Sequence, residues 1–416
     1  MKKTETILTK EAIWKKNLYA MWTSQFLVNM GFGLAMSFIP YFLEEIATLT
    51  ENQLSLYTGL SSTIPSAAMA VAAPFWGKMS DRYGRKNMLV RALVFGSITL
   101  VLIGSSKSIL FFLFARAFQG FFTGSVPASM ALISANTPDK EMTKALGVMT
   151  SSNFLGYAVG PLLGGFICEW IGYSGCFYVG SVVNTIGLLI VVFMIKEIPG
   201  TYGRELVEQQ KLKKAAGEKT GVLTTGIIMI LVTMLCMRLA RTVFGPFLAI
   251  FVREVLGTMD GATQMIGIIN LVTCVATGVS SITLARLGDK YDKFKYAGLL
   301  TVGAFVVSLL MGLPVSIWVF IAFYGMFYFL VGGIEPVLTS AASEIVDPGS
   351  RGVLFGLLST CSSLGMMFSP MLGSVVSVVF GVRQIIFVIP MFIFLELIAT
   401  LVMINYAKKK RMENEA

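Results

Sequence analysis

Three arginines and two glutamates lie deep inside long apolar stretches of this 416-residue chain, where an ionised side chain is costly. Arg116, Arg238 and Arg241 are permanently cationic, and Glu335 and Glu396 are carboxylic acids. A charged side chain in such surroundings usually faces a partner or water, and it marks a binding or proton-transfer site. A carboxyl group there can also hold a proton at neutral pH. These residues could therefore bind an anion or carry protons.

The elements that must hold these side chains are twelve apolar stretches. Each is long enough to cross about 30 Å of hydrocarbon as a helix, which takes roughly 20 residues. Only a helix satisfies its own backbone hydrogen bonds cheaply in lipid, so we expect an all-α integral membrane protein with twelve transmembrane helices. The predicted spans are 18–42, 54–76, 88–105, 109–133, 146–168, 174–195, 224–251, 261–284, 297–313, 317–341, 353–376 and 384–406.

The basic residues between these stretches predict the orientation. Of the 33 Lys and Arg residues, only Lys107, Arg253 and Arg383 fall in the odd-numbered loops. The positive-inside rule therefore puts both termini of a multi-pass cell-membrane protein in the cytoplasm. Topology and contact with anionic lipid explain the net charge of +10 better than nucleic acid does, because the basic residues are dispersed over short loops.

The sequence also excludes several classes of site. The chain has no histidine, which removes imidazole proton relays and most transition-metal sites. We expect no cofactor, no metal and no enzymatic nucleophile–base–acid set. A channel is disfavoured because no ring of charges or filter repeat occurs. Cys168 and Cys176 flank one predicted outer loop, and buried thiols are favoured there over a disulfide.

The second half of the chain repeats the first at an offset of 209 residues. Pro127 aligns with Pro336 and Pro161 with Pro370, so the spacing of the two prolines is the same in both halves. Chance similarity would not preserve it, and the offset therefore predicts a duplicated six-helix unit around a substrate path. The expected parts are a cytoplasmic tail (1–17), an N-terminal bundle (18–195), a cytoplasmic linker (196–223), a C-terminal bundle (224–406) and a cytoplasmic tail (407–416).

Two glycines frame an acid and a basic cluster in the loop after the second stretch. Gly84 permits a tight turn, and Asp81 can face a helix N-terminus or Arg85. The loop resembles the G-x-L-x-D-R-x-G-R-[KR] signature of the major facilitator superfamily, with Met79 in the leucine position. The residues that this resemblance implies for conformational gating are Gly77, Asp81, Arg82, Gly84, Arg85 and Lys86.

Two further motifs narrow the resemblance. Arg116 begins an R-x-x-Q-G element like that of the superfamily, although Gln119 and backbone carbonyls could instead hold this arginine permanently. The fifth stretch carries glycines at four-residue spacing, a smooth stripe against which another helix can pack closely. Its string is similar to the antiporter motif of drug:proton exporters and comprises Gly156, Gly160, Pro161, Gly164 and Gly165.

The resemblance covers the whole chain and implies the twelve-helix drug:proton antiporter branch of the superfamily. Two pseudo-symmetric six-helix bundles would then export a small amphipathic drug or metabolite by alternating access, in exchange for protons, as a monomer. The alternative is a metabolite, sugar or glycolipid transporter of the same superfamily with an anionic substrate. A non-transporting receptor on this fold also stays open.

Helical spacing predicts which side chains line the cavity. Gln25, Asn29 and Phe32 share one face of the first helix, and the offset maps Asn29 onto Arg238 and Phe32 onto Arg241. At least one of these arginines should then face the cavity, with a buried structural ion pair as the alternative. The predicted substrate-binding residues are Gln25, Asn29, Phe32, Arg116, Asn153, Arg238, Arg241, Asn270 and Tyr328.

The candidate proton-coupling residues are Glu335, Glu396 and Arg116. Glu335 lies in the tenth stretch, one of those that line the path in the superfamily, although a gating or structural role is an alternative. Glu396 lies in a helix that is peripheral in the family, where pairing with an arginine is favoured. Three arginines against two acids favour an anionic or zwitterionic substrate.

Overall fold

A computed structural model describes residues 2–138, 141–196, 225–288, 290–313, 316–345 and 351–415, and no strand occurs in them. Within these ranges, the side chains that lie outside the description are those of 2–13, 78, 81, 135, 142–144, 225–226, 285, 343–345, 351–356, 359 and 406–415. The chain divides into two compact units. One holds Met1–Ala47 and Ile64–Glu218, and the other holds Thr48–Thr63 and Lys219–Ala416.

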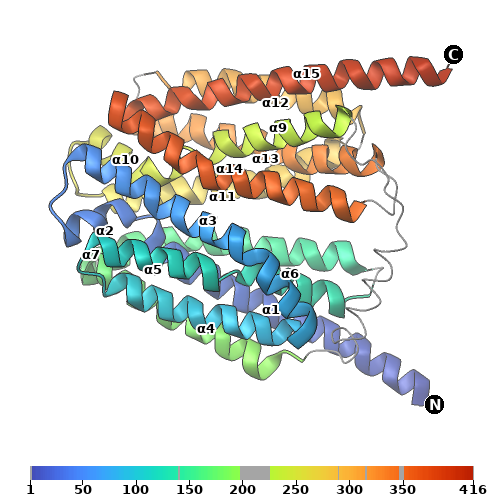
Figure 1. Cartoon of the computed structure of the whole chain (residues 1–416), viewed down its shortest axis with the longest axis horizontal. Helices are drawn as coiled ribbons and strands as arrows, with labels where there is room; N and C mark the ends of the chain where they lie inside the picture. The colour runs from blue at the N-terminus through green and yellow to red at the C-terminus, as the bar shows by residue number, and fades with distance from the viewer. Residues whose placement is uncertain are drawn as a thin grey trace. The chain divides into compact units, whose positions relative to one another are not determined.

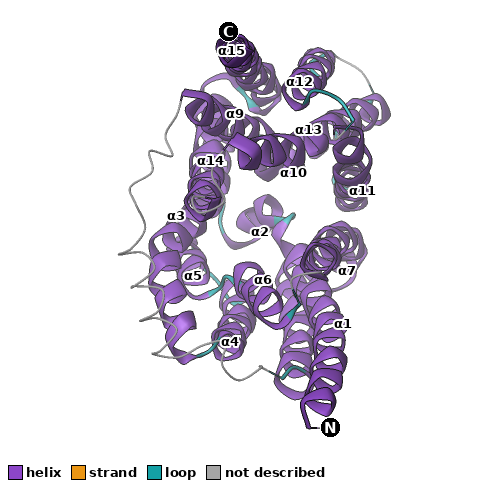
Figure 2. Ribbon diagram, turned by 90° about the vertical axis from the view of Figure 1, so that its right-hand side faces the viewer, coloured by secondary structure: helices purple, strands orange, loops and turns teal. Residues whose placement is uncertain are grey.

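Helices and short connections make up both units (Figure 2). The first unit contains α1 (Lys2–Met36), α2 (Ile39–Ile46), α4 (Arg85–Gly104), α5 (Ile109–Phe122), α6 (Ser125–Asn136) and α7 (Met142–Met194). The second contains α9 (Thr225–Thr242), the 3-10 turn η2 (Gly245–Phe247), α10 (Leu248–Leu256), α11 (Ala262–Gly288), α12 (Lys293–Leu310), α13 (Ile317–Ile345), α14 (Arg351–Phe380), η4 (Val382–Phe387) and α15 (Val388–Glu415). The remaining helix, α3 (Glu51–Tyr83), contributes its first part to the second unit and the rest to the first.

Most residues of each of the twelve predicted stretches lie in helices, and the first, fourth and seventh stretches are interrupted. Within the described residues, nine helical segments are long and apolar enough to cross a membrane, or ten if the bent pair α1–α2 is one span. One of the nine, α7, covers both the fifth and the sixth predicted spans, which are separated by non-helical backbone at Gly172. The protein is therefore an all-α, multi-pass membrane protein.

The two units repeat the same helix packing. In the first, α1 and α4 both lie against α7. In the second, α9 lies against α14 and α15, which correspond to the two parts of α7, and α12 lies against α15 as α4 does against α7 (Figure 1). The equivalence follows the offset in the sequence, so the internal repeat that the prolines indicated is also a repeat of structure.

Backbone irregularities fall at equivalent positions of the two copies. Gly172, which separates the two parts of α7, has φ 74°, and Gly381, which aligns with it and precedes η4, has φ 95°. A left-handed φ of this kind suits glycine, because a Cβ there is strained. The first helix of each copy is also interrupted at the same point, at 37–38 between α1 and α2 and at Gly245–Phe247 between α9 and α10.

Gly172→Ala is expected to lower the free energy of unfolding by about 1–3 kcal/mol, because only glycine adopts this φ and ψ without strain. The measurement is thermal unfolding of the purified protein in detergent. Gly147→Ala in the same helix is the matched control, since a Cβ on Gly147 would meet nothing within 4 Å. Equal melting temperatures for the two variants would contradict the prediction.

The turn at Gly172 also brings two cysteines together. Cys168 and Cys176 are joined by a disulfide, with their Cα atoms 5.7 Å apart. The sequence favoured buried thiols, and both residues are buried, but that interpretation missed the pairing. It treated the two helices as separate spans, whereas the glycine turn folds one back onto the other directly.

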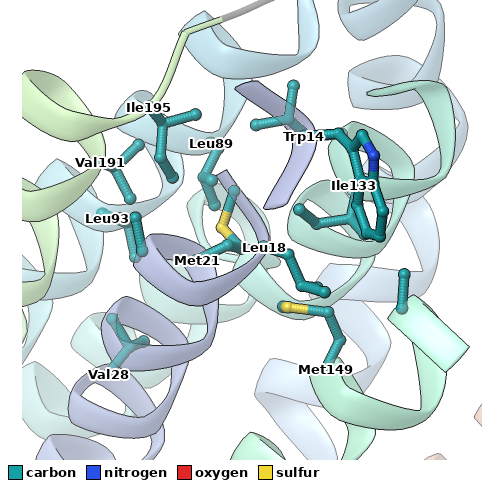
Figure 3. Close-up of a cluster of buried hydrophobic side chains, with 13 residues drawn as sticks. Trp14, Leu18, Met21, Val28, Leu89, Leu93, Ile133, Met149, Val191 and Ile195 are labelled. Atoms are coloured by element: carbon teal, nitrogen blue, oxygen red, sulfur yellow. The ribbon is translucent and has the colours of Figure 1, made fainter. Parts of the chain in front are cut away.

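One end of the first unit is closed by an apolar cluster that joins four helices (Figure 3). Trp14, Leu18 and Met21 of α1 pack there with residues of α4, α6 and α7. Lys86 lies at the same end and donates to the carbonyl oxygens of Val192 and Ile195, at 2.9 and 2.7 Å. The lysine thereby neutralises free carbonyls at the C-terminus of α7.

Candidate functional site

Both arginines of α9 converge on one carboxylate of α13. The Nη2 atom of Arg238 lies 2.8 Å from Oε1 of Glu335, and Nη1 of Arg241 lies 3.4 Å from Oε2. Arg238 and Arg241 are three residues apart and hence on one face of their helix. Both arginines therefore take part in an ion pair, which is one element of the alternative that the sequence left open.

The carboxylate is the more accessible part of this cluster. The side chain of Glu335 is 38% exposed, against 19% for Arg238 and 15% for Arg241. Arg238 and Glu335 also line a cavity of about 300 Å³ within the second unit, together with Met234, Met237, Thr339, Leu358 and Ser362. Two cations against one anion leave the cluster with a net positive charge, beside a space large enough for water or a small molecule.

Neighbouring groups fix the positions of the two arginines. Tyr328 donates its hydroxyl to the carbonyl oxygen of Arg241 at 2.7 Å, and its ring lies 5.5 Å from that guanidinium. Arg241 in turn donates to Thr277 of α11 at 3.4 Å. Gly365 of α14 leaves room for Arg238, because a Cβ there would lie 2.8 Å from the Cβ and Cγ atoms of the arginine. The ion pair is thus held by four helices.

In the first unit, the polar residues predicted on α1 face inward. Gln25 and Asn29 are buried, and Asn29 donates to Oδ1 of Asn153 on α7 at 2.7 Å. The amide of Gln25 has no hydrogen-bond partner among the described residues. Phe32 points toward α4, where its ring would touch a Cβ added to Gly96 at 3.4 Å. The offset therefore relates Asn29, which is hydrogen-bonded to an amide, to Arg238, which pairs with a carboxylate.

Arg116 lies buried on α5 and donates to the amide oxygen of Gln119 one turn away. It also donates to the sulfur of Met36 at the end of α1, at 3.1 Å. The local contact with Gln119 is the one that the structural alternative predicted. Asn270 of α11 donates to the carbonyl of Ile266 in its own helix at 2.9 Å, so its amide group is engaged locally.

Gly84 and the basic residues after it form the turn between α3 and α4. Gly84 has φ 98° and precedes the first residue of α4, so the motif's second glycine is required by the turn. Arg85 donates to the carbonyl of Ala131 on α6 at 3.1 Å, and Arg82 is exposed with its guanidinium over the ring of Tyr83. Gly77 is exposed, and the side chain of Asp81 lies outside the described residues.

The glycine stripe of α7 packs directly on α1. A Cβ on Gly156 would lie 2.7 Å from Asn29 Cβ, and one on Gly160 would lie 2.7 Å from the carbonyl oxygen of Met30. One on Gly164 would overlap the carbonyl oxygen of Leu34. The remaining motif residues, Pro161 and Gly165, are buried. The stripe therefore brings two backbones into contact, with no room for any side chain.

Glu396 of α15 is fully buried, and its contacts differ from the expected arginine pair. Its Oε1 atom lies 3.4 Å from the hydroxyl of Thr301 on α12, and Oε2 has no hydrogen-bond partner among the described residues. Thr301 also donates to the carbonyl of Ala297. A protonated carboxyl can donate to the threonine oxygen, whereas a carboxylate would need more donors than this site supplies.

Glu396→Gln is therefore expected to change the free energy of unfolding by less than about 1 kcal/mol, since an amide makes the same hydrogen bond as a neutral acid. Thermal unfolding in detergent tests this, with Glu396→Ala as the comparison variant that opens a cavity and melts lower. A large loss of stability in Glu396→Gln would mean that the site needs a negative charge.

The family follows from a comparison over the whole chain. A model of the Major Facilitator Superfamily matches residues 21–237 and again residues 230–415. The chain belongs to this superfamily. The two matches correspond to the two copies of the repeat, and superfamily members are transporters, so a small-molecule substrate and a membrane location follow directly.

Relatives within the superfamily align over nearly the full length. The chain is 28% identical to "Multidrug resistance protein MdtG" of Proteus mirabilis over 404 residues, which covers 95% of this chain and 98% of that protein. It is 27% identical to "Multi-drug resistance efflux pump PmrA homolog" of Lactococcus lactis, which covers 97% and 98% of the two chains. Among solved structures, nucleoside transporter NupG shares the fold, with a TM-score of 0.73, 11% identity and coverage of 93% of this chain and 99% of that one.

Sequence reasoning about this superfamily member missed several contributors to the cluster. Thr277 and Thr339 are unremarkable threonines in apolar helices, yet one binds Arg241 and the other lines the cavity and donates to the carbonyl of Glu335 at 2.7 Å. The four-residue spacing of Glu335 and Thr339, which puts both on one face of a helix, was the pattern that could have indicated Thr339. In the sequence, Gly365 was distinguished only by its alignment with Gly156 at the offset of the repeat.

Proposed function

We propose that this protein exports a small amphipathic compound, a drug or a metabolite, by alternating access and in exchange for protons. The match over nearly the full length to one protein named as a multidrug resistance protein and another named as a multi-drug resistance efflux pump carries the proposal. The close packing of α7 on α1 through the stripe typical of such exporters supports it. We further propose that the protein acts as a monomer with both termini in the cytoplasm, as the distribution of basic residues suggests.

The cluster of Arg238, Arg241 and Glu335 supports a particular substrate charge. An anionic group can replace the carboxylate of Glu335 at either arginine. Protonation of Glu335 would aid this replacement. A substrate that carries only a negative charge would therefore bind best together with a proton. Exchange requires the opposite, namely that the substrate and the proton exclude each other. A zwitterion meets this requirement, because its cationic group pairs with ionised Glu335 while its anionic group pairs with an arginine.

Flux in proteoliposomes tests the proposal, with a panel of anionic, zwitterionic and monocationic amphipathic compounds and with or without an imposed pH gradient. We expect proton-driven exchange of a zwitterionic compound, reduced in Arg238→Ala and Arg241→Ala. Transport of lipophilic monocations alone, undiminished in both variants, would overturn the assigned charge. An absence of flux for every class, with the variants still folded, would favour a receptor, and uptake of a sugar or metabolite anion with protons would favour the alternative transporter.

Gating is proposed to involve the α3–α4 loop, where Gly77, Asp81 and Arg85 match the superfamily signature. Asp81→Asn is expected to reduce exchange at least tenfold without altering folding, because the acid would no longer bias the equilibrium between conformations. The measurement is flux together with size-exclusion behaviour. Lys107→Gln, a substitution in a predicted loop at the other end of the helices, is the control and should transport normally. Equal rates for Asp81→Asn and the wild type would remove this role.

A further inference from the structure

A second cavity lies inside the first unit, apart from every residue assigned above to substrate or proton. It has a volume of about 250 Å³ and lies among α3, α4, α5 and α6. Its walls are mainly apolar, with Met69, Ala72 and Pro127 among them, and the hydroxyl residues Ser80 and Thr123 also line it. One cationic side chain, Arg91 of α4, takes part in the lining.

The guanidinium of Arg91 stacks on an aromatic ring. Its guanidinium carbon lies 3.5 Å from the centre of the Trp76 ring, and its Nε and Nη1 atoms are buried without a hydrogen-bond partner among the described residues. Stacking on a tryptophan stabilises a desolvated cation. It leaves the N–H donors unsatisfied, however, and these donors require acceptor oxygens. An arginine in an apolar span without such acceptors is costly.

Trp76 is a fixed platform for this guanidinium. Its indole nitrogen donates to the carbonyl oxygen of Phe121 at 2.7 Å. The rings of Phe75, Phe121 and Phe122 lie within 4.8 to 6.1 Å of the indole ring. The indole therefore cannot easily turn away, and it holds the guanidinium of Arg91 in one place beside the cavity.

The fold itself does not require this arrangement, because the second unit lacks it. In this part of the repeat the offset is 208 residues, because Asp81 and Tyr83 match Asp289 and Tyr291 there. At that offset Trp76 aligns with Leu284 and Arg91 with Leu299. In the second unit Leu284 fills the space beside Gly333, where an added Cβ would lie 2.6 Å from that of the leucine. A Cβ on the equivalent Gly124 would meet nothing within 4 Å. The first unit thus keeps an open space and a charge that its twin replaces with leucines.

We propose that this cavity is a binding site for an oxyanion, a carboxylate or a phosphate, that is attached to an apolar body. The guanidinium fork of Arg91 supplies a positive charge and N–H donors for the anion's oxygens, and the apolar walls take the hydrocarbon part. Arg91 follows the first residue of α4 by six positions, which places it about 9 Å along the helix. An anionic lipid and a free amphiphilic acid both present this chemistry near the end of a span.

The test uses the tryptophan of the site as its reporter. A variant keeps Trp76 and replaces the other tryptophans with phenylalanine, namely Trp14, Trp22, Trp170 and Trp318. The purified protein in detergent is titrated with 9,10-dibromostearate and, separately, with its methyl ester, because bromine quenches indole fluorescence only at close range. The two probes have the same apolar body, and only one is an anion.

We expect the acid to half-quench Trp76 at a concentration at least fivefold lower than the ester, and Arg91→Gln to bring the two within twofold. Arg91→Lys, which keeps the charge but not the fork, should retain part of the preference and guards against a folding defect in Arg91→Gln. The matched control retains only Trp170, which is 87% exposed, and should be quenched equally by both probes. Equal quenching of Trp76 by acid and ester, or a preference that survives in Arg91→Gln, would overturn the proposal.

A second arm separates the two sources of the anion. The Trp76 reporter is placed in phosphatidylcholine nanodiscs that contain either brominated phosphatidylglycerol or brominated phosphatidylcholine. Stronger quenching by the phosphatidylglycerol, abolished by Arg91→Gln, assigns the site to lipid. Equal quenching by the two lipids together with preference for the free acid assigns it to an amphiphilic carboxylate.

Discussion

Glu335→Gln is expected to reduce exchange at least tenfold and to abolish its response to a pH gradient. The substitution removes the carboxylate that pairs with Arg238 and Arg241, and it removes the most accessible titratable group of the cluster. Two guanidinium groups then face each other across one turn of α9 without an anion, which costs about 1–3 kcal/mol of folding free energy. The measurements are proteoliposome flux and thermal unfolding.

A second ion pair in the same unit provides the control. Glu254 of α10 pairs with Arg383 at 2.8 Å, and both side chains are about half exposed. Because exposed pairs contribute no more than about 1 kcal/mol, Glu254→Gln should leave both flux and melting temperature near those of the wild type. The double variant Glu335→Gln with Arg238→Gln should recover stability but not transport. Coupled exchange at the wild-type rate in Glu335→Gln would remove this residue from the mechanism.

Gly164→Ala is expected to destabilise the protein strongly. The added Cβ would overlap the carbonyl oxygen of Leu34 on α1, and a backbone atom cannot move aside as a side chain can. Overpacking typically costs about 1–3 kcal/mol, and more where the backbone must shift. The expected result is a lower melting temperature and a smaller yield of monodisperse protein after size-exclusion chromatography.

Gly147→Ala again serves as the control, since it adds the same methyl group to the same helix in open space. It should match the wild type or exceed it slightly, because alanine favours the helix over glycine by up to about 1 kcal/mol. If Gly164→Ala has the same melting temperature as Gly147→Ala, the close approach of α7 to α1 is not required for stability.

The helices and the internal repeat were predictable because they depend on local patterns. Apolar length locates each span, and Pro127 and Pro336 record the offset directly. Breaks inside the spans were not predicted. The fourth span was expected to be continuous, yet α5 ends at Phe122 and α6 begins at Ser125, with Gly124 at φ 117° between them. Such a break depends on how neighbouring helices approach, which a hydropathy pattern does not contain.

The candidate site was predictable in its membership but not in its contacts. Helical spacing and the repeat brought Arg238 and Arg241 together on one face, and composition singled out Glu335. Their pairing joins residues 97 and 94 positions apart, and nothing local in the sequence specifies it. Glu396 illustrates the reverse case. Its charge suggested an arginine partner, but its depth in the helix packing decides its surroundings, and Thr301 lies there instead.

The matching glycine turns at Gly172 and Gly381 have a consequence for substitutions in both copies. The two copies keep the same backbone bends while their ionisable residues diverge, with Asn29 opposite Arg238 and Leu299 opposite Arg91. The bends of the backbone therefore do not depend on which ionisable side chains the helices carry. A substitution at one of these ionisable positions should accordingly change the charge of a site and leave the bends of the helices in place.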